Sequence, residues 1–317
     1  MKKTILTCLI GLISVLTFAQ KITVNGIVND AQGKPVPFAF IKDAVHNHAA
    51  FSDPNGAFTF KVDTADRLLV SAPGFNKTTV TIKDPQNVSV VLAADGANGV
   101  KTAASGESFK EKLSTEGMTR NAGSEYIGKE GALHGSRYLF ENWVHGYVLT
   151  STDSIKQNDN YLFNYQKMDG SLILTEDGHT MQTINRHTIK MFVLFDDQGQ
   201  YYTFENLPAI DPTHFLQLLS TGSSYKIYKQ FNTKFIPNNY VSNGMTSTGN
   251  NYDEFKDDPS YYAVKVPGGT PQKFVLKSKS IKTAFAADAP KVSKYLSDHD
   301  ADMDDNYITD LGNYLNW

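Results

Sequence analysis

The chain has 317 residues, and its content of 40% hydrophobic and 20% charged residues is that of an ordinary globular protein. This length suits two domains, and the composition excludes an intrinsically disordered chain. The formal net charge is −3 with no basic run, which argues against nucleic acid and anionic membrane surfaces as partners. The 16 Tyr and 19 Phe favour β structure, because aromatic side chains suit pleated, half-buried surfaces.

Residues 1–19 have the features of a cleaved signal peptide. A basic start precedes an apolar stretch, and Thr17 and Ala19 are small residues at positions −3 and −1 of a cleavage site before Gln20. The stretch is too short to cross a bilayer, so no transmembrane segment is expected. Cys8, the only cysteine, lies near the start of the stretch and not at its end, which argues against a lipid anchor. We expect an exported protein in the periplasm, at the outer-membrane periphery or outside the cell, without disulfides.

Residues 21–92 contain short segments of alternating polarity separated by turn residues. The predicted strands are ITVNGIV, VPFAFI, AFTFKV, RLLVSA, KTTVTI and NVSVVL. Asn55 and Gly56 end a strong turn, because both residue types tolerate a positive φ. Strands at this spacing without a helical pattern predict an immunoglobulin-like antiparallel β-sandwich.

The same stretch resembles the carboxypeptidase regulatory-like domain. The matching residues are Gly26, Val28, Asp30, Gly33, Pro35, Pro37, Ala39, Ser52, Asp53, Gly56, Phe58, Leu68, Val70, Ser71, Gly74 and Phe75. The segment HNHAAFSD departs from the family's usual approach to the turn at Asp53. The resemblance implies a non-catalytic accessory sandwich of the kind common in exported Bacteroidetes proteins.

Residues 93–132 are rich in Gly, Ala, Ser, Lys and Glu and predict a linker. Residues 133–317 then form a second region, which is β-rich and ends in helices. Four hairpins are predicted, turning at KMDG, DDQG, STGSS and VPGGTP, and they suggest one antiparallel sheet or a partly closed barrel. The segments KSIKTAF, PKVSKYLSDH and DDNYITDLGNYLNW predict three short helices, because their apolar residues recur at spacings of three and four. From about Tyr138 onwards the chain resembles an uncharacterised family of exported Bacteroidetes proteins, on RYLFENWVHGYV, the FVLF and YYTF strands and the closing helices.

An acidic run between the last two predicted helices has the spacing of a calcium loop. Asp298, Asp300, Asp302 and Asp304 occupy positions 1, 3, 5 and 7 of an EF-hand loop. Met303 and Thr309 stand where that loop needs its Gly and its bidentate Glu, so only a weak calcium site is conceivable. The alternative, which we favour, is that Asp302 to Asp305 cap the last helix. No other cofactor is expected.

No catalytic motif is present. His46 and His48 would face the same side of a strand, but a third metal ligand is missing nearby, so exposed histidines are the favoured interpretation. The aromatic residues Trp143, Tyr147, Tyr201 and Tyr202 are candidates for lining a groove for a glycan or peptide, with core packing as the alternative.

The sequence therefore predicts an exported, non-enzymatic envelope protein in which an accessory sandwich carries a β-rich module for protein or glycan recognition. The alternative is a hydrolase whose site is assembled by folding in the second region, a possibility that sequence motifs do not address.

Overall fold

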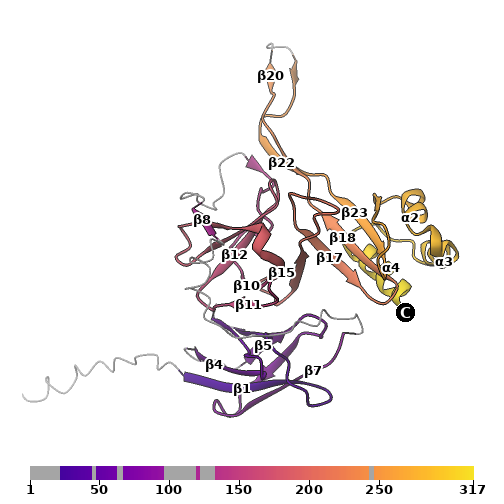
Figure 1. Cartoon of the computed structure of the whole chain (residues 1–317). Helices are drawn as coiled ribbons and strands as arrows, with labels where there is room; N and C mark the ends of the chain where they lie inside the picture. The colour runs from indigo at the N-terminus through magenta and orange to yellow at the C-terminus, as the bar shows by residue number, and fades with distance from the viewer. Residues whose placement is uncertain (1–21, 45–47, 63–66, 96–118, 122–132, 243–245) are drawn as a thin grey trace, which may run out of the picture.

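The computed structural model describes residues 22–44, 48–62, 67–95, 119–121, 133–242 and 246–317 (Figure 1). The predicted signal peptide and His46 lie outside these described residues. So does most of the predicted linker. The fold is mainly β, as predicted, with several antiparallel sheets and three short helices at the C-terminal end.

Two sheets form the N-terminal sandwich. The first has the order β4–β1–β7, with strands Ala57–Val62, Ile22–Asp30 and Val88–Leu92. The second has the order β3–β2–β5–β6, with strands Ala49–Phe51, Phe40–Asp43, Arg67–Ser71 and Thr78–Thr81. Strand β7 shows the pattern that builds the core, since Val88, Val90 and Leu92 are buried between exposed neighbours. The pairing is antiparallel except between β1 and β7, which run parallel.

The predicted turn at Asn55 and Gly56 joins β3 to β4 and so crosses from one sheet to the other. One carboxylate oxygen of Asp53 accepts hydrogen bonds from the backbone N–H groups of Asn55 and Ala57, at 2.8 and 2.9 Å. Gly56 has a φ of +76°, and an added Cβ would lie 2.4 Å from the carbonyl oxygen of Val28. Only glycine fits this position without strain.

The second region contains an eight-stranded sheet with the order β11–β10–β15–β16–β17–β18–β23–β24. Its strands are, in that order, Ile155–Gln157, His145–Thr150, Ile189–Phe195, Tyr201–Glu205, Leu216–Thr221, Tyr225–Gln230, Ser260–Lys265 and Gln272–Phe274. A four-stranded sheet, β12–β13–β14–β8, consists of Leu162–Gln166, Ser171–Thr175, Gln182–Ile184 and Thr119–Asn121. The short 3₁₀ helix η1, Arg186–Thr188, precedes β15.

A small sheet, β19–β22–β9, is made of Thr233–Ile236, Asp253–Asp257 and Leu133–His134. Beyond it, β20 (Val241–Ser242) and β21 (Ser247–Thr248) form a hairpin that projects from the body at the end opposite the sandwich (Figure 1).

All four predicted hairpins are present, but the prediction that they form one sheet or a partly closed barrel is wrong, because they belong to two sheets. The KMDG turn joins β12 to β13 in the four-stranded sheet, whereas the other three join neighbours in the eight-stranded sheet. Of the predicted linker, residues 93–95 and 119–121 are described: Ala94 bridges to Phe75 of the sandwich, and β8 pairs with β14.

The eight-stranded sheet is covered on both faces. Strand β15 alternates, so that Phe192 and Leu194 pack against the four-stranded sheet while Val193 and Phe195 pack against the sandwich. The contact with the sandwich is an aromatic cluster in which Phe40 stacks on Phe195 with ring centroids 4.9 Å apart. This buried, apolar contact joins the sandwich to the second region.

Three helices close the chain: α2 (Ser278–Ala284), α3 (Ala289–Asp298) and α4 (Asp305–Asn316), with the 3₁₀ helix η2 (Ala286–Asp288) between the first two. They pack beside β18 and β23 (Figure 1) and bury a cluster that includes Ile281, Val292, Ile308 and Leu311. No helix within the described ranges is long and apolar enough to cross a membrane.

Candidate ligand cleft

The first wall of the cleft is the β15–β16 hairpin, which the sandwich holds in place. The ammonium of Lys42 pairs with Asp197 in the hairpin turn at 2.9 Å, and Lys77 donates a hydrogen bond to the carbonyl of Gln198 at 3.2 Å. The hydroxyl of Tyr201 accepts a hydrogen bond from the N–H of Gly74 and donates one to Asp95, each at 3.2 Å. The start of β16 is therefore fixed to the sandwich.

The second wall is the β17–β18 hairpin, which helix α4 holds in place. The hydroxyl of Ser220 donates a hydrogen bond to the side chain of Asn313 at 3.0 Å. The side-chain oxygen of Asn316 accepts hydrogen bonds from the backbone N–H groups of Ser224 and Tyr225, at 3.0 and 2.8 Å. The helix approaches so closely that a Cβ on Gly312 would lie 2.5 Å from the Cβ of Ser220.

Because the two hairpins are fixed to different bodies, β16 and β17 separate. They pair only between residues 203–205 and 216–218. In contrast, β16 stays paired with β15 to Tyr201, and β17 stays paired with β18 to Thr221. A bulge in β17 between Leu218 and Ser220 turns the strand away from β16.

The opening between the strands is a cleft of about 870 Å³. The sandwich, both strands and the helices contribute to its lining, which mixes rings, amides, hydroxyls and carboxylates. The residues are Pro73, Gly74, Asp95, Gln200, Tyr201, Tyr202, Thr203, Gln217, Leu218, Leu219, Ser220, Thr221, Lys229, Tyr261, Leu276, Met303, Asp304, Asp305, Asn306, Thr309 and Asn313.

The cleft carries more negative than positive charge. Among the described residues, its carboxylates are those of Asp95, Asp304 and Asp305, and its only ammonium is that of Lys229. Asp305 pairs with Lys229 and accepts a hydrogen bond from the hydroxyl of Tyr261 at 2.8 Å. Burial and this hydrogen bond raise the pKa of Tyr261, so its hydroxyl remains a donor at every physiological pH.

Of the four aromatic residues predicted to line a groove, two line the cleft and two do not. Tyr201 and Tyr202 line the cleft. Tyr147 is 2% exposed within the aromatic contact between the sandwich and the second region, so a ligand does not reach it. Trp143 lies away from the cleft, where its indole N–H donates to the carbonyl of Gly178 at 3.2 Å.

In the acidic run of residues 298–305, one aspartate caps the last helix. Asp304 is the N-cap of α4 and accepts a hydrogen bond from the N–H of Tyr307 at 2.8 Å. Asp298 pairs with Lys294, while Asp300 and Asp302 are exposed. Within the described part of the chain, no group of three or more His, Cys, Asp and Glu side chains is placed to hold a metal ion.

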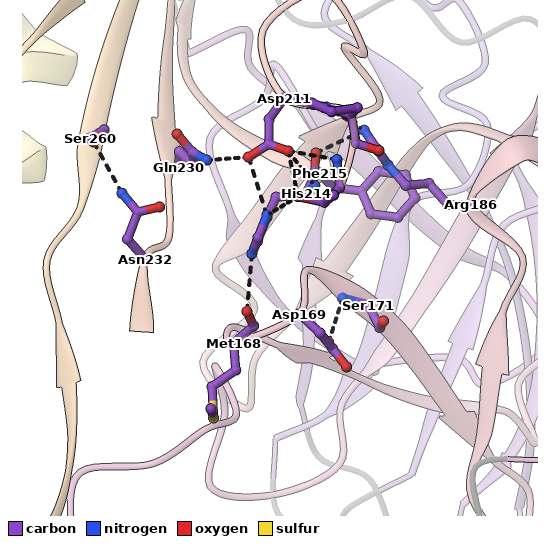
Figure 2. Close-up of polar contacts among 12 residues, drawn as sticks. Met168, Asp169, Ser171, Arg186, Asp211, His214, Phe215, Gln230, Asn232 and Ser260 are labelled. Carbon is purple, nitrogen blue, oxygen red and sulfur yellow. Dashed lines mark hydrogen bonds and ion pairs between the residues drawn. The ribbon is translucent and has the colours of Figure 1, made fainter. Parts of the chain in front are cut away.

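A second polar cluster, centred on Asp211 and His214, was not predicted from the sequence (Figure 2). The carboxylate of Asp211 accepts hydrogen bonds from the N–H groups of Thr213 and His214, at 2.6 and 3.0 Å, and from the amide of Gln230. Burial alone raises the pKa of Asp211, but the hydrogen bonds from Thr213 and His214 outweigh it, and the net effect lowers the pKa. The sequence signal for this cluster is limited to the segment DPTHF, residues 211–215, whose Asp and Pro are typical of a turn.

The remaining contacts of this cluster show that it fastens a loop. The imidazole of His214 contacts Asp211 at 3.2 Å on one side and the carbonyl of Met168 at 3.2 Å on the other. The guanidinium of Arg186 donates to the carbonyls of Asp211 and His214, both at 2.9 Å. These groups tie the loop before β17 to the turn between β12 and β13.

The molecule is thus a mainly β protein with an N-terminal sandwich and an open cleft at the junction of sandwich, sheet and helices. No protein-family model matches the chain, and no curated protein matches it. Among solved structures, the chain has a low-scoring likeness to BcpA, the major pilin subunit of Bacillus cereus, and to a variant of it. The identity is 9% and the TM-score 0.18 for BcpA, and the identity is 10% and the TM-score 0.19 for the variant. In both cases 81% of this chain and 93% of the other are covered. Scores this low carry no argument about fold or function.

Proposed function

We propose that this protein is an exported, non-enzymatic envelope protein that binds a protein or glycan partner in the cleft between β16 and β17. The observation that supports it is the cleft itself, which has the volume of a ligand site and a lining of tyrosine rings and convergent polar groups. Hydrogen bonds from the sandwich and from α4 fix the two walls before any ligand arrives.

Binding is a better account of the described residues than hydrolysis. A catalytic histidine needs a ring nitrogen directed at the substrate. His214 is paired with a carboxylate, but both of its nitrogens have protein partners, and neither His214 nor Asp211 lines the cleft. The hydrolase alternative therefore has no specific observation in its favour.

We further propose that the sandwich is a carboxypeptidase regulatory-like domain that acts as a support. The seven strands in two sheets and the Asp53 to Gly56 turn agree with the resemblance seen in the sequence. Its support role follows from its contacts, because Gly74 and Asp95 fix Tyr201 at the edge of the cleft. Export and a location in the envelope rest on the signal-like residues 1–19.

The test is to measure binding of the purified mature chain to a glycan array and to solubilised envelope proteins. A cleft variant, Asn306→Arg, changes an exposed residue of the lining, and Asp310→Asn makes the same change in charge on α4 outside the lining. We expect a ligand whose affinity falls at least about tenfold in Asn306→Arg and stays unchanged in Asp310→Asn. Turnover of an ester or glycoside panel, together with no ligand on either screen, would overturn the proposal.

A further inference from the structure

The two strands that border the cleft present unpaired backbone edges to each other. In the β15–β16 ladder the N–H of Asp196 donates to Gln200 and the N–H of Asn206 donates to Lys190. Antiparallel ladders alternate, so Tyr202 and Phe204 direct their backbone groups at β15, whereas Tyr201 and Thr203 direct theirs at β17. Thr203 is paired with Leu218, but Tyr201 has no strand opposite.

The backbone of Tyr201 is thus available for pairing. Among the described residues, its carbonyl accepts one hydrogen bond, of 3.3 Å, from the side chain of the exposed Gln200. Within the described ranges, no backbone hydrogen bond joins Tyr201 to residues 219–221 across the opening. Unpaired edges of this kind are where an extended peptide adds to a sheet by main-chain hydrogen bonds.

The side chains around the opening suit a strand, whose residues alternate between two faces. On the helix side lie Leu276 and Met303, which offer apolar contact, and on the sandwich side lies Pro73. Three carboxylates against one ammonium, the latter already paired with Asp305, leave the cleft acidic. A lysine or arginine in the bound segment would meet the exposed Asp304.

We propose that the cleft receives an extended polypeptide segment, which inserts as an additional strand between β16 and β17 and carries a basic residue towards Asp304. This proposal rests on the proposed binding function and names its ligand class. A peptide is favoured over a glycan because the hydroxyls of Tyr201 and Tyr261 are already engaged by protein groups, whereas the strand edges are not.

The experiment uses the full mature chain and a phage-displayed library of ten-residue peptides. We expect enriched peptides with an alternating pattern and a Lys or Arg. Each is then resynthesised with N-methyl groups on alternate residues, which removes main-chain donors and leaves the side chains in place. Strand insertion predicts that affinity falls at least about tenfold on N-methylation of either alternate set, because one set donates to β16 and the other to β17. Asn306→Arg should also weaken binding about tenfold, and Asp310→Asn should not.

The outcomes separate this proposal from the broader one. Peptides that tolerate N-methylation of either alternate set overturn insertion between the two strands. Failure to enrich any peptide, with a glycan that binds the native chain but not Asn306→Arg, overturns strand insertion and leaves the binding function standing. If no peptide, glycan or envelope protein binds, both proposals fail.

Discussion

At the residue scale, the adjacent residues Tyr201 and Tyr202 lie on opposite faces of β16, because side chains alternate along a strand. The hydroxyl of Tyr201 contacts Gly74 and Asp95 in the direction of the sandwich, and the ring of Tyr202 packs at 5.1 Å against Phe140. Both line the cleft because it passes between strands, so residues from both faces reach it. Polar lining residues such as Ser220 and Asn313 had no sequence signal, since only packing of α4 on β17 brings them together.

At Gly56, the structure predicts that adding a single methyl group lowers the stability of the fold. In Gly56→Ala the positive φ and the clash with the carbonyl of Val28 act together, and we expect a loss of about 2 to 4 kcal/mol in the free energy of unfolding. Gly33→Ala is the matched control, because its φ is +79° but an added Cβ meets nothing within 4 Å, so only about 1 kcal/mol should be lost. Urea unfolding of both variants measures the difference. Equal losses would show that the contact with Val28 is relieved by a backbone shift.

At the element scale, turn chemistry predicted the hairpins well because each depends on a few adjacent residues. The assignment of a hairpin to a sheet depends on non-local packing. The KMDG hairpin joins the four-stranded sheet because Phe163, Tyr165, Leu172 and Leu174 pack against Phe192 and Phe204 of the other sheet. Likewise the separation of β16 from β17 depends on two anchors that are distant in the sequence. Local patterns do not contain that information.

The acidic run before α4 contributes to stability through the N-cap of that helix. Asp304→Ala removes the N-cap hydrogen bond to Tyr307 and should lower the free energy of unfolding by about 1 kcal/mol. Asp302→Ala, at an exposed position without a capping role, should stay within about 0.5 kcal/mol of the native chain. Thermal unfolding with millimolar calcium is the second measurement, and capping alone predicts no change in Tm. A rise of several degrees that chelator reverses would instead establish a calcium site.

At the scale of the whole molecule, the aromatic contact between the sandwich and the eight-stranded sheet sets the geometry of the cleft. Phe40 and Phe51 from the sandwich pack on Tyr147 and Phe195 from the sheet, so the β15–β16 hairpin moves with the sandwich. The β17–β18 hairpin moves with α4. Any shift of the sandwich relative to the helices would therefore open or narrow the cleft between them.

His145 makes this contact sensitive to pH. Its ring packs against Phe40 at 5.8 Å, and among the described residues its Nδ1 has no hydrogen-bond partner. Burial, and then the nearby Lys42, lower the pKa of His145 from 6.5 to about 4, while Asp197 opposes the shift. The unfolded chain therefore binds a proton that the folded chain excludes between these values. The contribution of His145 to the free energy of unfolding should therefore be at its full value above about pH 6.5 and decrease as the pH falls towards 4.

The expected loss is about 3 kcal/mol across that window, and it is measured by urea unfolding at half-unit pH steps. The matched variants are His145→Phe, which removes the titrating group, and His187→Gln, which removes an exposed histidine. If the contact with the sandwich carries the effect, the component of the pH slope between 6.5 and 4 disappears in His145→Phe and persists in His187→Gln. An unchanged slope in His145→Phe would assign the acid sensitivity to other groups. Because the same contact positions Tyr201, the affinity of the cleft for its ligand should fall over the same pH range.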